Sequence, residues 1–149
     1  NQLKYHFDTN CGVCHQVMPE AGLIRPGMIV VATDSHTTTH GAFGAVGTGC
    51  GATDMAAVLM TGEMWFRVPE VRLEGETKKG VYPKDVILAV LGKIRADGAV
   101  YKAIDFTGSY VEGLNVAGRM VICNMAVEMG AKTAYMQPNQ AVLEYVEKC

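Results

Sequence analysis

The chain has 149 residues, of which 49% are apolar, and its 13 Lys and Arg against 15 Asp and Glu give a formal net charge of −2. This length allows one ordinary hydrophobic core or two small ones. The charge balance offers no basic face for nucleic acid and no polybasic segment for a membrane surface, so we expect a small molecule or another protein as partner. The sequence shows no apolar run of roughly 20 residues and no signal-peptide pattern, which predicts a soluble, cytoplasmic protein.

The cysteines are scattered rather than arranged as a disulfide framework. An odd number at irregular spacing favours reduced thiols; they are Cys11, Cys14, Cys50, Cys123 and Cys149. Residues 11–15 match C-x-x-C-H, a pattern found at haem attachment sites and, as C-x-x-C, in one half of many zinc sites. Haem attachment goes with export, and such a zinc site needs a second close pair, so we predict no metal ligand in this chain.

The elements expected from periodicity alternate between strands and helices. Residues 23–33 contain a Pro-Gly turn and then a β-branched run, which predicts a buried strand that ends just before Asp34. Five glycines within residues 41–51 argue against a regular element there and permit close approach of another backbone. The later expectations are a helix over 55–60 capped by residues 53–54, a strand over 71–74, a helix over 83–94, a strand over 99–106, a helix over 118–129, a strand over 132–136 and a helix over 140–147. Alternation of this kind predicts an α/β fold, and a change of pattern near residue 69 predicts a domain boundary.

The polar residues 33–41 place an acid, a hydroxyl and an imidazole side by side at a strand end. A serine triad made of Asp34, Ser35 and His36 fails on geometry because adjacent side chains point apart. His36 and His40 have the i, i+4 spacing of a helical metal pair, but the intervening threonines and the following glycine argue against a helix. In an extended segment Asp34 and His36 would face one pocket. The plainer alternative is a polar turn with solvated histidines.

Two further patterns are open to more than one interpretation. Residues 47–52 match G-x-G-x-x-A with Glu70 at about the distance of a ribose contact, so a dinucleotide-binding domain is the rival from another functional class. Its weakness is that residues 34–46 separate the glycines from the preceding strand. Asn124 and Glu128 are four residues apart on an expected helix, so their side chains would share one face. They would either act together in a site or simply form part of the solvent-exposed polar face.

Several short segments occur in the order seen in the aconitase superfamily, and the order is far more specific than any one of them. They are residues 14–16, residues 33–37, the glycine-rich stretch leading into residues 53–56, residues 83–88, and residues 122–126 followed by Glu128. Because these segments span essentially the whole chain, it resembles the large subunit of two-subunit members of that superfamily. The resemblance implies three-layer α/β/α domains, with residues 1–69 as the C-terminal part of a first domain and residues 70–149 as most of a second.

The same resemblance implies a hydro-lyase that moves a hydroxyl group between adjacent carbons by dehydration and rehydration. Its substrate would be a hydroxy di- or tricarboxylic acid. We expect 3-isopropylmalate, an intermediate of leucine biosynthesis, with homoaconitate or a related acid as the alternative. The implied partner is a small swivelling subunit that helps to recognise the variable group of the substrate.

Matching positions carry the roles of the family's catalytic residues onto this chain. His15 is similar to the imidazole that pairs with Asp34, and His36 to the imidazole that pairs with Glu128. In such pairs the carboxylate fixes the tautomer and orientation of the imidazole and raises its basicity.

Three other polar residues complete the comparison. Ser35 would bind the substrate and Asn124 would lie beside the cofactor, whereas His40 matches no role and is expected to behave as a surface residue. The cofactor implied is a [4Fe-4S] cluster, but the family's Cys-Thr-Asn segment and its later C-x-x-C are missing. The chain is therefore expected to be an internal fragment that neither holds a cluster nor catalyses the reaction alone.

Overall fold

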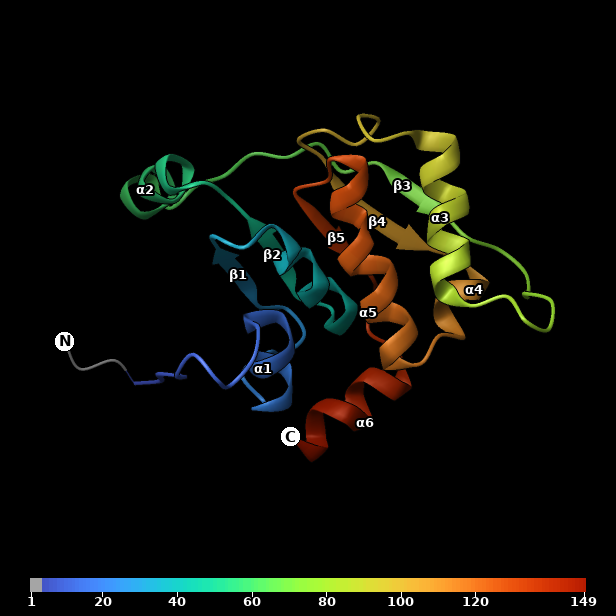
Figure 1. Cartoon of the computed structure of the whole chain (residues 1–149), viewed down its shortest axis with the longest axis horizontal. Helices are drawn as coiled ribbons and strands as arrows, with labels where there is room; N and C mark the ends of the chain where they lie inside the picture. The colour runs from blue at the N-terminus through green and yellow to red at the C-terminus, as the bar shows by residue number, and fades with distance from the viewer. Residues whose placement is uncertain (1–3) are drawn as a thin grey trace.

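The computed structural model describes residues 4–149 as an α/β fold with two separate parallel sheets (Figure 1). In chain order the elements are α1 (Cys14–Glu20), β1 (Ile29–Ala32), η1 (Ser35–Phe43, a 3₁₀ helix), β2 (Val46–Gly49), α2 (Ala52–Thr61), β3 (Glu70–Arg72), α3 (Pro83–Ile94), β4 (Ala103–Thr107), α4 (Ser109–Glu112), α5 (Val116–Met125), η2 (Ala126–Met129, also 3₁₀), β5 (Thr133–Tyr135) and α6 (Gln140–Lys148). The predicted α/β class is confirmed. The helices α1 and α4 were not anticipated, and η1 and β2 form where the sequence argued against regular structure.

Both sheets are parallel, so each pair of strands is joined by a crossover. β1 pairs with β2 from Ile29↔Val46 to Ala32↔Gly49, and η1 lies in the connection between them. The second sheet has the order β3-β4-β5, with α3 in the first crossover and α5 in the second. α3 and α5 pack against each other over this sheet (Figure 1).

The best-predicted helix, α3, begins and ends where its sequence indicates. Pro83 occupies its first turn, where a missing N–H costs nothing, and the Asp85 carboxylate accepts a 2.8 Å hydrogen bond from the backbone N–H of Tyr82. Ile87 is fully buried, and Val90 and Leu91 pack against the core beside it. The expected helix over 83–94 is therefore confirmed at both ends.

A helix within residues 35–43, against which the sequence argued, is present as η1. Asp34 caps it by accepting a 2.7 Å hydrogen bond from the backbone N–H of His36. The hydroxyls of Thr37 and Thr39 donate to the carbonyls three residues earlier, at 2.6 and 2.7 Å. The prediction was wrong because threonines that are poor in an exposed helix are stabilised here by burial and by these local bonds.

The glycine-rich stretch forms part of η1 and the strand β2, and its missing side chains allow the two to touch. A Cβ on Gly47 would lie 2.2 Å from the Thr37 carbonyl oxygen, and one on Gly49 would lie 2.4 Å from that of Asp34. The expected close backbone approach is thus confirmed, with this chain as its own partner. The space that a dinucleotide phosphate would need at these glycines is taken by η1, which contradicts the dinucleotide-binding alternative.

The core of the second sheet extends onto η1, and a buried arginine lies inside it. Arg119 on α5 has no exposed surface and donates to the carbonyl of Ala42 at 3.0 Å, to that of Val111 at 3.1 Å and to that of Gln137. Three segments that are distant in sequence are therefore joined through one guanidinium. η1 connects the two strands of the first sheet and packs against β5 of the second sheet and against α5, and β2 also contacts β5. The two sheets are therefore packed directly against each other. A domain boundary near residue 69 stays a prediction.

α2 differs from every other helix of its length because it buries no side chain. Leu59 and Met60 are 79% and 86% exposed, and the helix stands apart from both sheets (Figure 1). Its N-cap is Gly51 rather than the predicted residues 53–54, although Asp54 does lie in the first turn. Nowhere in residues 4–149 is a helix long and apolar enough to cross a membrane.

Candidate functional site

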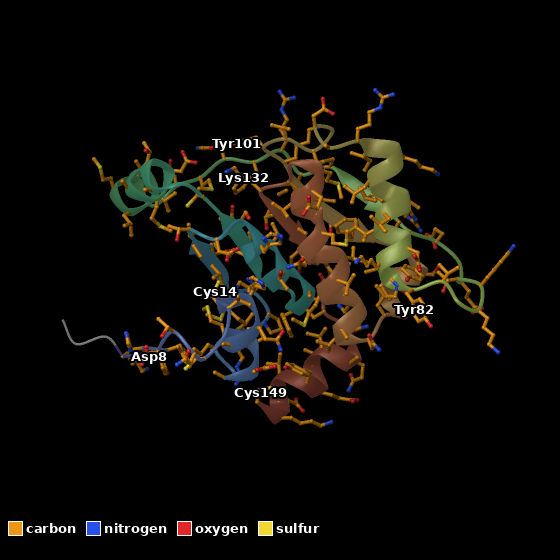
Figure 2. All side chains as sticks on the ribbon, in the orientation of Figure 1. Asp8, Cys14, Tyr82, Tyr101, Lys132 and Cys149 are labelled. Carbon is orange, nitrogen blue, oxygen red and sulfur yellow. The ribbon has the colours of Figure 1, made fainter. Side chains whose placement is uncertain are left out.

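Three of the predicted site residues meet where α1, the end of β1 and the start of η1 come together. Donor atoms of Cys14, His15 and Asp34 all lie within 4.8 Å of one another. The rings of His15 and His36 have their centroids 5.9 Å apart, and His36 Nδ1 lies 3.7 Å from Asp34 Oδ1. Figure 2 shows Cys14 near this junction, beside the β1–β2 sheet. The site therefore consists of two imidazoles, one carboxylate and one thiol.

Asp34 serves two purposes at once. Its Oδ1 accepts the backbone N–H of His36, which starts η1, and the same carboxylate faces the two imidazoles. The capping bond holds the carboxylate in place without using all its acceptor positions. The acid–imidazole interpretation of this segment agrees with the geometry, whereas the alternative of a polar turn with solvated histidines does not hold for His40, which is buried within η1.

The predicted pairing of the histidines is only partly reproduced. His15 lies within 4.8 Å of Asp34 as expected, and His36 also contacts Asp34, with its Nδ1 3.7 Å from Oδ1; no contact of His36 with Glu128 is present among residues 4–149. Glu128 is exposed on η2. The α-helical pitch ends at Met125, so the i, i+4 relation that would place Glu128 below Asn124 no longer applies.

His15 and Asn124 line an open pocket of about 610 Å³ together with Thr39 and Lys84. Asn124 is held there by a 2.9 Å hydrogen bond that its side-chain amide donates to the Thr39 hydroxyl. Ser35 is exposed at the edge, with its hydroxyl 3.2 Å from His36 Nδ1, and does not line the pocket. Sequence reasoning missed Thr39 and Lys84, and only the position of Thr39 within the polar segment could have indicated it.

Cys14 was also missed as a neighbour of the imidazoles, although it precedes His15 directly. Its sulfur lies 3.9 Å from His15 Nδ1. Burial, and then the negative charge of Asp34, raise the pKa of the Cys14 thiol above its usual range. The thiol therefore stays protonated near neutral pH unless a cation enters the site.

His40 is not the surface residue that the sequence predicted, because its side chain is fully buried within η1. Neither ring nitrogen has a hydrogen-bond partner among the described residues. The hydroxyls of Thr38 and Thr48 are likewise buried without a hydrogen-bond partner there. Burial, with a smaller contribution from His15, lowers the pKa of His40 from 6.5 to about 4. A fully buried imidazole in such surroundings is neutral at physiological pH.

Acid should destabilise the chain through His40. Below a pH of 6.5 the unfolded chain binds a proton that the folded chain does not bind until about 4, so the free energy of unfolding falls as pH drops through this range. The interval corresponds to about 3 kcal/mol. Urea unfolding of the wild type and of His40→Gln should be measured at neutral pH and near pH 4. The free energy of unfolding should depend less steeply on pH in the variant. His6→Gln changes an exposed imidazole and is the control, and equal pH dependence in all three would contradict the assignment.

The parallel α/β fold brings two imidazoles to one carboxylate at a strand end, a group of side chains that can hold and transfer protons. The sequence model of the aconitase family (aconitate hydratase) matches residues 2–149, and the chain belongs to this family.

Two of its relatives are large subunits of other proteins. A probable methanogen homoaconitase large subunit of Methanothermobacter thermautotrophicus is 56% identical over 143 residues, which are 94% of this chain and 33% of that protein. The 3-isopropylmalate dehydratase large subunit 1 of Methanopyrus kandleri is 55% identical over 149 residues, which are 98% of this chain and 36% of that protein. The chain spans about a third of the length of the curated relatives it matches.

Proposed function

We propose that this chain is the part of an aconitase-family large subunit that supplies the acid–base residues of a hydro-lyase. The observation that carries the proposal is the convergence of His15 and His36 on Asp34. Membership of the aconitase family supports it, because family members interconvert hydroxy acids by removing and adding water.

Dehydration needs one group that takes a proton from carbon and another that protonates the departing hydroxyl. With two imidazoles beside one carboxylate, one ring can be neutral and accept a proton while the other is protonated and donates one. The carboxylate stabilises the protonated ring next to it. Asp34 is already fixed by its bond to the η1 backbone, so it can orient both rings without reorganising. His15 reaches the pocket directly, which suits a ring that meets the substrate.

We propose 3-isopropylmalate as the substrate and homoaconitate as the alternative. The relatives carry both names. The apolar residues that line the pocket favour an acid with a hydrocarbon group, whereas Lys84 and Asn124 suit its carboxylates; the apolar residues are Val13, Met120, Val121 and Met125. Assaying isopropylmalate, homoaconitate and citrate with the complete large subunit and its small subunit tests this. A preference for homoaconitate would overturn the substrate and leave the reaction class standing.

The [4Fe-4S] cluster implied by the family does not fit the residues of this chain alone. Within residues 4–149, the one group of three metal-binding side chains contains a single cysteine. Cys50 and Cys123 are buried, and Cys11 and Cys149 are exposed elsewhere. The proposal therefore places the cluster thiolates outside this chain, in the complete large subunit.

The remaining assignments are also proposals. The relatives are called large subunits, which supports a small-subunit partner. The free thiols suit a reducing compartment such as the cytoplasm. Asn124 is proposed to lie beside the cofactor, Ser35 to contact the substrate, and Glu128 to act once the rest of the protein approaches η2.

Replacing Asp34 with Asn in the complete enzyme should lower kcat/KM on the order of 10 to 100-fold, the usual loss when the partner of an active-site imidazole is removed. Asp8→Asn is a matched control, because Asp8 is exposed and also accepts a 2.7 Å bond from a nearby backbone N–H, but lies apart from Cys14, the neighbour of His15 in the cluster (Figure 2). Adding His15→Gln to Asp34→Asn should cost much less than the product of the single losses. Multiplicative losses, or an equal effect at Asp8, would show that these residues do not act as one unit.

A further inference from the structure

The side chains of Cys14, His15 and Asp34 form a cluster whose chemistry extends beyond acid–base catalysis. They bring together one sulfur, one imidazole nitrogen and one carboxylate oxygen, all within 4.8 Å of one another. We propose that this cluster binds a single divalent transition-metal ion, with Zn²⁺ as the best match. This inference does not depend on the proposed function, because it needs only residues of this chain.

The donor set identifies the class of ion. Thiolate and imidazole ligands select Zn²⁺ and similar ions over Mg²⁺ or Ca²⁺, which take oxygen ligands. Zinc bonds of roughly 2.0–2.3 Å place the ligand atoms of a tetrahedral site about 3.6 Å apart. Cys14 Sγ and His15 Nδ1 are 3.9 Å apart, close to that separation, and the ligand atoms of all three residues lie within 4.8 Å of one another.

The surroundings place a second imidazole beside the three-residue cluster and give a reason for a cation to bind there. His36 Nδ1 lies 3.7 Å from Asp34 Oδ1, which puts a second imidazole at the edge of the cluster. The Cys14 sulfur and a carboxylate oxygen of Asp34 lie within 4.8 Å of each other, so without a cation a Cys14 thiolate would be repelled by the carboxylate. A divalent ion between the two groups removes the repulsion and displaces the thiol proton.

The site differs from the one that the C-x-x-C spacing suggested. Cys11 is exposed, and its sulfur is not part of the cluster, so the pair of cysteines does not act together. The sequence could not reveal the third ligand, because Asp34 comes from the end of another element. A metal bound here would occupy His15 and Asp34 and so withdraw them from proton transfer.

Titration of the 149-residue chain with Co²⁺ tests the proposal, because a cobalt–thiolate bond gives a charge-transfer band in the near ultraviolet. We expect one equivalent of Co²⁺ to bind with this band and Zn²⁺ to displace it. Cys14→Ser should remove the band and weaken binding by at least about 100-fold, the upper end of losses seen for partners that merely support a ligand. Cys11→Ser, the matched control, should keep both. The absence of a thiolate band in the wild type, or its loss in Cys11→Ser alone, would overturn the proposal.

A second measurement needs no variant and so does not depend on whether one folds. Alkylation of the wild-type chain, followed by peptide mapping, gives the rate at which each cysteine reacts. Zn²⁺ should slow the reaction of Cys14 strongly and leave that of Cys11 unchanged. Equal protection of both cysteines, or none at Cys14, would show that the cluster does not bind the ion.

Discussion

Gly41→Ala should lower the free energy of unfolding by about 3 kcal/mol or more, at the upper end of what overpacking costs. A Cβ at this position would lie 1.8 Å from the carbonyl oxygen of Ala134 and 2.6 Å from its carbon. The obstacle is backbone, and it belongs to β5, whose Ala134 is paired with Ile104 of β4. The Gly41 carbonyl also accepts a 3.2 Å hydrogen bond from Met136 N–H. Relief of the clash therefore requires η1 and β5 to separate.

Gly92→Ala is the matched control for this substitution. Gly92 lies within α3, is exposed, and has no atom within 4 Å of an added Cβ. Alanine there should stabilise the chain by roughly 0.5–1 kcal/mol, because glycine is a poor residue for a helix interior. Urea unfolding of the two variants beside the wild type should thus give changes of opposite sign. A loss below about 1 kcal/mol at Gly41 would mean that the two backbones separate more easily than the structure indicates.

Arg119→Met should cost about 3 kcal/mol or more. Methionine keeps much of the length and apolar volume, but it leaves the carbonyls of Ala42, Val111 and Gln137 buried without a donor. Each orphaned carbonyl costs roughly 1–3 kcal/mol. Removing the buried charge returns part of its desolvation cost, which is why the expected loss lies at the low end of the sum.

An exposed arginine provides the comparison. Arg25 donates one 2.7 Å bond, to the carbonyl of Val146, so Arg25→Met should cost only about 1 kcal/mol. Arg119→Lys should fall between the two, since an ammonium on a flexible stem does not reproduce the fixed fork of a guanidinium. Thermal and urea unfolding rank the three variants. An Arg119→Met variant as stable as Arg25→Met would show that the three carbonyls find other partners.

The predictable part of the fold is the part that local chemistry determines. α3 has a proline start and an apolar stripe, and α6 was expected over 140–147 and runs from Gln140 to Lys148. η1 escaped prediction because threonine and glycine propensities describe exposed helices, whereas residues 37–43 are wholly buried. In the same way, His40 looked solvated because nothing local indicates that β2 and α5 cover η1.

In the candidate site, too, only the contacts between residues close in sequence could be predicted from local chemistry. Asp34 and His36 are neighbours in sequence, so their proximity could be predicted. The position of His15 beside them came from a family resemblance, since α1 and the end of β1 meet only in the folded chain. The pairing of His36 with Glu128 also came from the family resemblance and stays a prediction. In this chain Glu128 lies exposed on η2, after α5 has ended at Met125.

The exposed helix α2 connects the two sheets along the chain but contributes no fully buried residue to the packing between them. This helix and its flanks form the covalent link, whereas the sheets meet through η1, β5 and α5. A single cut at Gly62 would therefore sever the polypeptide without removing a core contact. The two pieces would remain one folded body by complementation, held by the same backbone contact at Gly41 that makes a single added methyl group so disruptive.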